Sequence, residues 1–298
     1  MMILPAWAGE TVTIYSPYPP GYTLDPALFE VIATANKQQD QFVFVMERRP
    51  GGNTLLSIRA MEMRKNSSLS LIGAPTVELF RQSVLTDSDY VPVIAFGDAC
   101  WAVVSKVNQG SVAGLKQVPN AQLTWGTGGI GGASHLTGLQ ISSAIGKTIN
   151  FVHFKSAADA NTVLVGDNNL NLSLMSVRAF KTFNAKNPSI KMIAMSCDRR
   201  HPQAAEVRTL KEQGISAPAV FNTIVAHREF DAVKLQTIAS ILNQAASAVG
   251  NERIMELTDF NSPQFNTQSA VNFHRRKLHE INDYLDRYSE QIKKETLQ

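Results

Sequence analysis

Short apolar runs alternate with amphipathic segments along most of the chain. Runs of strand-like composition lie at residues 11–15, 42–46, 68–73, 90–96, 100–105, 123–125, 150–154, 170–174, 190–195 and 219–226. Strands that alternate with helices predict mainly parallel sheets with helices on their faces. A polar stretch at 106–114 interrupts the alternation, which then starts again. We therefore expect an α/β fold with two lobes that face a cleft, 10–105 with 226–298 forming the first and 106–225 the second.

The chain after residue 231 has only helical patterns. Apolar residues recur at helical spacing in 232–249, 252–257 and 265–294. In the last segment Leu278, Ile281, Leu285, Tyr288 and Ile292 follow a spacing of three and four, which is typical of a packed seam. We expect this helix to dock on its own domain, and a coiled-coil dimer is the alternative.

A glycine-rich stretch at 122–136 is the most unusual part of the sequence. It reads QLTWGTGGIGGASHL, a short strand followed by five glycines and then a helical pattern. Glycine lets backbone N–H groups approach a ligand, and the first N–H groups of a helix favour an anion. The stretch therefore predicts an anion-binding loop, and a simple strand-to-helix turn is the alternative.

The same stretch contains a G-x-G-x-x-G pattern at Gly126, Gly128 and Gly131. A dinucleotide site needs an acidic residue roughly 20 positions later for the ribose hydroxyls. Residues 142–156 contain none and carry Lys147 and Lys155 instead. The pattern therefore favours an anion site that does not bind a nucleotide.

A proline-rich loop follows the first predicted strand. Residues 16–22 read SPYPPGY, which cannot continue a strand because proline lacks a ladder donor. Asp25 and Pro26 then predict a helix start, with Asp25 as N-cap. Ligands of parallel α/β sheets bind beyond the carboxyl ends of the strands. We expect the loops at 16–23 and 74–76 to lie at that edge.

Charge and length exclude some classes of protein. The chain has 298 residues, 44% of them hydrophobic, and a net charge of only +3. Scattered basic residues do not predict a nucleic-acid partner, and no apolar run reaches the length of a bilayer span. Residues 1–9 predict the remnant of a signal peptide, because Ala6-Trp7-Ala8 fits the cleavage pattern. An ordinary N-terminus is the alternative.

The sequence offers no convincing catalytic or metal-ligating group. Ser134 and His135 do not form a nucleophile elbow, and His279-Glu280 lacks the second histidine of a zinc motif. We expect no enzyme, no cofactor and no metal. Cys100 and Cys197 lie beside apolar runs, which favours buried thiols, although a bridge between different lobes would lock those lobes together.

Four motifs resemble those of the substrate-binding proteins of tripartite tricarboxylate transporters, the Bug or TctC-like receptors. YSPYPPG at 15–21 is similar to the family's V-P-F-P-P-G-G, and ERRPGGN at 47–53 is similar to E-N-R-P-G-A-G-G-N. LTWGTGGIGGASHL at 123–136 closely follows L-T-Y-G-S-G-G-x-G-S-x-x-H-L, and VHFKS at 152–156 replaces V-P-Y-K-G. Order and spacing agree along nearly the whole chain. Tyr22 departs from the pattern, since the family has a second glycine there.

The resemblance implies a periplasmic-binding-protein fold of the Venus flytrap type, in which two lobes close over a small carboxylate held by N–H groups and ordered water. The ligand-binding positions it implies are Tyr15, Pro17, Pro19, Gly21, Tyr22, Thr23, Ala74, Pro75, Thr127, Gly128, Gly129, Gly131, Ser134, His135, Met175 and Ser176. The expected protein is a periplasmic, monomeric receptor that delivers an organic acid to membrane transporter subunits. A periplasmic carboxylate sensor and an enzyme acting on a small anionic metabolite are the alternatives.

Overall fold

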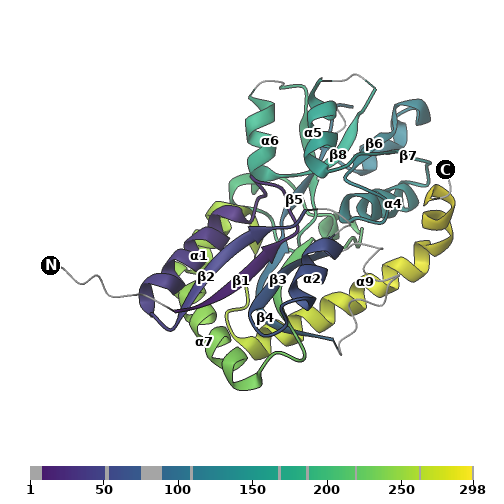
Figure 1. Cartoon of the computed structure of the whole chain (residues 1–298). Helices are drawn as coiled ribbons and strands as arrows, with labels where there is room; N and C mark the ends of the chain where they lie inside the picture. Colours follow the sequence, from purple (N-terminus) through teal and green to yellow (C-terminus); the bar gives the residue numbers. More distant parts are fainter. Residues whose placement is uncertain are drawn as a thin grey trace. The chain divides into compact units, whose positions relative to one another are not determined.

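The computed structural model of the chain describes residues 9–50, 54–74, 89–107, 110–166, 169–185, 188–218, 220–261 and 263–296 (Figure 1). Contacts between Cα atoms divide the chain into two compact units. The first comprises Met1–Gly73, Glu78–Gly97 and Asn222–Arg276, and the second comprises Ala74–Val77, Asp98–Phe221 and Lys277–Gln298. The predicted signal-peptide remnant, apart from Gly9, and the loop position Pro75 lie outside the described residues.

The first unit is built around a six-stranded sheet in the order β11-β4-β10-β3-β1-β2. Its strands are β1 (Glu10–Ser16), β2 (Phe42–Arg48), β3 (Ser68–Ala74), β4 (Tyr90–Ala99), β10 (Phe221–His227) and β11 (Phe260–Asn261). β1 pairs in parallel with β2 and β3, so that Ile14 lies opposite Met46 and Leu69. The parallel pairing confirms the prediction from the strand–helix alternation, and it brings the carboxyl ends of β1 and β3 to one edge.

Helices α1 (Asp25–Gln38), α2 (Leu55–Glu62), α7 (Ala232–Val249) and α8 (Asn251–Thr258) accompany this sheet, and α1 packs against β2, α7 and α8. The apolar side of α1 includes Leu28, Val31 and Ile32, which are buried. Asp231 begins α7 as a side-chain cap that accepts a hydrogen bond from Lys234 N at 2.7 Å. Apolar patterning thus accounts for the buried side of α1, and a capping aspartate accounts for the start of α7.

The second unit is built around a five-stranded sheet in the order β7-β6-β8-β5-β9. Its strands are β5 (Trp101–Ser105), β6 (Thr124–Thr127), β7 (Asn150–His153), β8 (Leu172–Ser176) and β9 (Lys191–Met195). β6 pairs in parallel with β7 and β8, whereas β5 runs antiparallel to β8 and β9. The second sheet is therefore mixed, and β5 belongs to it, whereas the sequence analysis placed 100–105 in the first lobe.

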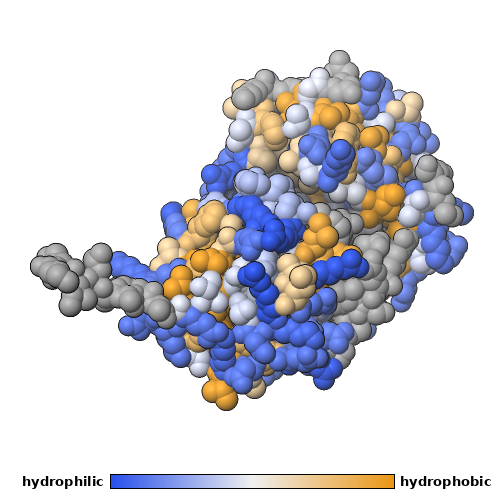
Figure 2. Space-filling model, in the orientation of Figure 1, coloured by the Kyte–Doolittle hydropathy of each residue, from blue (hydrophilic) through white to orange (hydrophobic). Residues whose placement is uncertain are grey.

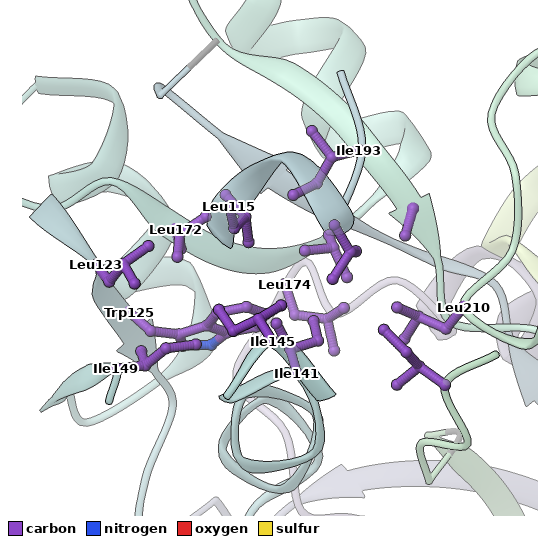
Figure 3. Close-up of a cluster of buried hydrophobic side chains, with 14 of the residues drawn as sticks. Leu115, Leu123, Trp125, Ile141, Ile145, Ile149, Leu172, Leu174, Ile193 and Leu210 are labelled. Atoms are coloured by element: carbon purple, nitrogen blue, oxygen red, sulfur yellow. The ribbon is translucent and has the colours of Figure 1, made fainter. Parts of the chain in front are cut away.

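Helices α4 (Ala133–Ile145), α5 (Ala157–Gly166) and α6 (Val177–Asn184) follow β6, β7 and β8, as Figure 1 shows. Short 3-10 helices lie at η2 (Ala113–Gln117), η3 (Asn120–Gln122), η4 (Pro202–Ala204) and η5 (Lys211–Gln213). Trp125 of β6 is fully buried in the core beside Ile141 and Ile145 of α4 (Figure 3). This core fixes the start of α4 next to the end of β6, where the glycine loop connects them.

The long helix α9 (Thr267–Thr296) contributes its residues from Lys277 onward to the second unit. Tyr284 and Ile292 pack with Leu136 and Leu139 of α4, and Leu285 and Tyr288 lie against the same cluster. The seam predicted from the sequence therefore packs within its own chain, against α4 of the second unit. Residues Lys277–Gln298 belong to the second unit, whereas the sequence analysis assigned them to the first lobe.

Cys100 and Cys197 form a disulfide with a Cα–Cα distance of 4.7 Å. Both residues belong to the second unit, so the bridge does not join the two units. The prediction of two buried thiols was wrong, because β5 and the segment after β9 are neighbours in the same sheet. The periodicity of the two apolar runs could not reveal that pairing.

Polar and apolar residues are mixed over the face drawn in Figure 2. Among the described residues, no helix has the length and apolar character needed to span a bilayer.

Candidate functional site

An ion pair fixes the loop that follows β1. Asp25 Oδ2 accepts a hydrogen bond from Gly21 N at 2.9 Å and lies 2.8 Å from Arg48 Nη2. Arg48 Nη1 donates to the carbonyl oxygens of Tyr18 and Pro19 at 3.2 and 3.1 Å. The Arg48 guanidinium is therefore hydrogen-bonded to acceptors of the protein itself and stabilises the loop.

Asp25 does not cap α1 with its side chain, contrary to the prediction. Leu24 occupies the N-cap position and Asp25 is the first residue of the helix, followed by Pro26. The carboxylate turns toward Gly21 and Arg48 because a guanidinium offers it a stronger, charge-assisted hydrogen bond than a helix amide would. The ERRPGG motif contains Arg48, but nothing in its spacing indicated that Asp25 would be the partner.

Two tyrosines of the same loop stack on each other. The ring centroids of Tyr18 and Tyr22 are 3.6 Å apart with an interplanar angle of 15°. Tyr18 Oη donates to Asn222 Oδ1 at 3.1 Å, and Asn222 Nδ2 donates to Tyr22 Oη at 2.9 Å. Gly73 is required beside this pair, because a Cβ there would lie 1.5 Å from Tyr18 Oη. Tyr22, whose position departs from the family motif, is thus a stacking partner held by a residue of β10.

Both phenols are neutral at physiological pH. Burial raises the pKa of Tyr18 well above its usual value and raises the pKa of Tyr22 to about 12. Desolvation disfavours the phenolate more than the neighbouring hydrogen-bond donors stabilise it. The pair can therefore present aromatic surface and hydroxyl groups to a ligand, but no charge.

The other predicted positions of the first unit differ in exposure. Tyr15 and Pro17 are buried, whereas Pro19 and Gly21 are exposed, and Gly21 adopts a φ of +87°. The Thr23 hydroxyl is buried and forms no hydrogen bond to the described residues. An unpaired buried hydroxyl costs free energy, so this oxygen is available to a ligand or a water molecule. Ala74 ends β3, and its predicted neighbour Pro75 is not described.

In the second unit the glycine loop leads from β6 to α4. Gly128 passes so close to α5 that an added Cβ would lie 2.6 Å from Ala157 N. Gly129 and Gly131 have φ values of +138° and +72°, which side chains other than hydrogen rarely allow. The glycines are therefore required by close backbone approach at one position and by conformation at two others.

Only some amides of this loop remain available. Gly129 N donates to Thr127 Oγ1 at 3.2 Å, and Gly131 N donates to His135 Nδ1 at 2.9 Å. Among the described residues we find no acceptor for the backbone N–H groups of Gly128, Ile130, Ala133 and Ser134. The last two begin α4, whose N-terminal dipole favours an anion. The loop can therefore bind a small oxyanion through unpaired N–H groups.

The side chains of Ser134 and Ser176 are used inside the protein. Ser134 Oγ accepts a hydrogen bond from Trp125 Nε1 at 3.0 Å and donates to Gly126 O at 3.3 Å. Ser176 Oγ caps α6 by accepting from Ala179 N at 3.1 Å. Met175 is 1% exposed and belongs to the core. The side chains of Ser134, Ser176 and Met175 therefore stabilise the protein, and only their backbone groups remain for a ligand.

His135 belongs to a buried cluster that the sequence did not reveal. Its Nε2 lies 2.8 Å from Glu295 Oε2 of α9, and His153 Nε2 lies 3.3 Å from the same oxygen. The imidazole of His135 is inaccessible to solvent. Burial, and to a smaller degree the neighbouring His153, lower the pKa of His135 to about 3, so the ring is neutral. Glu295 is 160 positions away in sequence, and its position carries no recognisable signal.

No protein-family model matches the sequence, and neither does any curated protein. Solved structures with the same fold do match over nearly the whole chain. The adipate-bound Rpa4515 of R. palustris shares 19% identity with a TM-score of 0.75 and covers 94% of this chain and 97% of its own. The malate-bound MatC (Rpa3494) of Rhodopseudomonas palustris shares 18% identity with a TM-score of 0.73, covering 92% and 98%.

A third match is the periplasmic binding protein BugD, at 14% identity and a TM-score of 0.74, which covers 94% of this chain and 97% of its own. At these identities the likeness shows a common fold. The chain therefore has the two-lobed α/β fold of the TctC and Bug solute-binding proteins, as the resemblance implied.

Proposed function

We propose that the chain is a solute-binding receptor of the TctC and Bug type, which captures a small organic acid outside the cytoplasm. The observation that carries this proposal is the set of unpaired N–H groups at Gly128, Ile130, Ala133 and Ser134, where the glycine loop meets α4. The fold adds support, because proteins of the same fold are known with adipate and malate bound.

A small carboxylate suits these donors, and residues 142–156 lack the acidic residue that the ribose of a dinucleotide would need. Backbone N–H groups at a helix N-terminus attract an anion without a cation in contact. Arg48, at the end of β2 in the first unit, is already bound to Asp25 and to two carbonyl oxygens. A small carboxylate therefore fits the unpaired N–H groups of the glycine loop, and within the first unit Tyr18 and Tyr22 offer neutral aromatic surface.

Delivery to a membrane transporter follows as the finer part of the proposal. The Cys100–Cys197 disulfide is typical of an oxidising compartment and supports a location outside the cytoplasm. We propose that the receptor acts as a monomer and hands its acid to transporter subunits in the membrane. No catalytic step is part of this function.

A calorimetric and thermal-shift screen of dicarboxylates, tricarboxylates, amino acids and aromatic acids tests the proposal. At least one acid should bind at a ratio of one per chain, and its binding should move the amide proton resonances of Gly128 and Ile130. A folded protein that binds none of these acids would contradict the proposal. Loss of acid uptake in a deletion strain supports transport, whereas intact uptake with altered gene expression indicates a sensor.

A further inference from the structure

We infer that Glu295, in the last turn of α9, is a positioning residue for the anion-binding loop and acts on it through the imidazoles of His135 and His153. The inference rests on the proposed function and adds to it which N–H groups of the loop meet the acid. Two chains of contacts lead from the Glu295 carboxylate to Gly131 and Gly129, and both lie within the second unit.

The first chain passes through His135. Its Nδ1 accepts the hydrogen bond of Gly131 N, so this nitrogen carries a lone pair. The proton of a neutral imidazole then sits on Nε2, the atom that lies 2.8 Å from Glu295 Oε2. A carboxylate opposite that proton stabilises the tautomer whose Nδ1 holds Gly131.

The second chain passes through His153. Thr127 Oγ1 accepts from Gly129 N at 3.2 Å and lies 2.7 Å from His153 Nδ1. When the hydroxyl proton points to Nδ1, His153 carries its own proton on Nε2, which lies 3.3 Å from Glu295 Oε2. The same hydroxyl also lies 3.3 Å from Gly129 O, a second acceptor for its proton. One carboxylate oxygen thus lies beside both imidazoles, and each imidazole contacts one glycine of the loop, His153 through Thr127.

A metal ion is the obvious competing occupant of this cluster. Two imidazoles and a carboxylate are a donor set suited to zinc, and the candidate ligand atoms of His135, His153 and Glu295 lie within 4.8 Å of one another. A metal needs the lone pair of Nε2, however, and the bond from Gly131 already uses that of Nδ1 in His135. Metal binding would therefore require the loss of this bond, so the bond from Gly131 favours a proton on His135 Nε2, the atom that lies 2.8 Å from Glu295 Oε2.

The docking of α9 brings Glu295 to this place. Ile292, one turn earlier, is 2% exposed and packs with Leu136 and Leu139 of α4. The Glu295 side chain is 19% exposed, and its Oε2 is buried without a well-aligned hydrogen bond among the described residues. A buried carboxylate oxygen needs compensating donors, and the two imidazoles are those within reach.

The consequence is that the backbone N–H groups of the loop have two different roles. Gly129 and Gly131 use their N–H groups internally to hold the loop in shape, whereas Gly128 and Ile130 keep theirs for the acid. The sequence analysis treated Gly128, Gly129 and Gly131 as equivalent contacts. Glu295 maintains the difference between them.

Glu295→Gln and Glu295→Ala test the inference, with Glu290→Gln as the matched control. Glu290 lies on the same helix with a side chain that is 78% exposed and pairs with Lys293. Three readouts apply: imidazole tautomers by nitrogen NMR, amide hydrogen exchange of Gly129 and Gly131, and affinity for the acid found in the screen. Thermal unfolding shows that each variant is folded.

In the wild type His135 should be the neutral Nε2–H tautomer, because Gly131 N donates to its Nδ1, and Gly131 should exchange slowly. Glu295→Ala should speed exchange of Gly129 and Gly131 by about tenfold or more and weaken acid binding by a similar factor, with Glu290→Gln unchanged. An Nδ1–H tautomer of His135 in the wild type, or unaltered exchange in Glu295→Ala, would overturn the inference, as would stoichiometric binding of added Zn²⁺ to the wild type that Glu295→Ala abolishes. If no acid binds the wild type, the proposed function fails, while tautomers and exchange still decide this inference.

Discussion

Asp25 and Arg48 form a charge pair, with 2.8 Å between Oδ2 and Nη2, that ties the loop between β1 and α1 to the end of β2. The Asp25 side chain is 7% exposed, and its partners are this guanidinium and the amide of Gly21. The pair therefore does more than an exposed salt bridge could, because removal of one partner leaves a buried charge.

Replacement of Arg48 by methionine should lower the free energy of unfolding by about 3 kcal/mol, since the Asp25 carboxylate would stay buried without its guanidinium. Arg49→Met is the matched control, because the neighbouring arginine is half exposed and pairs at the surface with Glu47. Its cost should stay below about 1 kcal/mol. Denaturant unfolding measures both values, and equal costs for the two variants would show that the pair with Asp25 has no special role.

The hydrogen bonds of Asn222 to Tyr18 and Tyr22 should be energetically coupled. Tyr18→Phe leaves Asn222 Oδ1 without its donor and should cost about 1 kcal/mol of folding free energy. In a double-mutant cycle, Asn222→Ala combined with Tyr18→Phe should cost less than the sum of the single changes. Strict additivity of the two costs would mean that the hydroxyl and the amide do not interact in solution.

Much of the fold was predictable because many of the strands can be recognised from their local sequence. The buried strands β1, β3, β6 and β8 are apolar runs bounded by glycine, proline or polar residues, and each is followed by a helical pattern where the chain is described. The glycine loop was predictable for the same local reason, since a run such as GTGGIGG fits few structures other than a tight strand-to-helix connection.

The errors concern partners that are distant in sequence. Nothing local to Trp101–Ser105 shows that β5 pairs antiparallel with β8 and β9, and the same pairing brings Cys100 next to Cys197. Asp25 looked like a helix cap because Arg48 was not known to lie beside it. The contact of Glu295 with the two histidines could not be predicted for a further reason, because a glutamate near the end of a charged helix is usually exposed to solvent.

Gly128→Ala should destabilise the second unit by about 1–3 kcal/mol through overpacking. The added methyl carbon would meet Ala157 N at 2.6 Å and Ser156 C at 3.1 Å, and these are backbone atoms that cannot turn aside. Gly166→Ala at the end of α5 is the control, because no atom lies within 4 Å of its Cβ position. The control should be neutral or slightly stabilising in thermal unfolding. A harmless Gly128→Ala would show that α5 does not press on the loop.

The disulfide should stabilise the chain against unfolding. It joins residues 97 positions apart, and bridges of this kind typically contribute about 2–4 kcal/mol. The Cys100→Ser, Cys197→Ser double variant should therefore unfold at a lower denaturant concentration than the oxidised wild type. Thiol titration of the denatured wild type without reductant should detect no free thiol, and two titratable thiols would contradict the bridge.

His135 should make stability depend on pH. Its pKa is lowered to about 3 in the folded protein, by burial first and by His153 second, and is about 6.5 when unfolded. The unfolded chain takes up this proton below about pH 6.5, whereas the folded protein does not until the pH approaches 3. The free energy of unfolding is therefore highest, as far as His135 is concerned, above about pH 6.5 and falls as the pH falls toward 3. The contribution to the slope is at most about 1.4 kcal/mol per pH unit.

The wild type and His135→Gln should therefore differ in the pH dependence of their unfolding free energy between about pH 6 and 4, with the shallower slope in the variant. His279→Gln, on the part of α9 near Leu278, is the control and should keep the wild-type slope. Parallel curves for the wild type and His135→Gln would show that His135 is protonated equally in the folded and unfolded states.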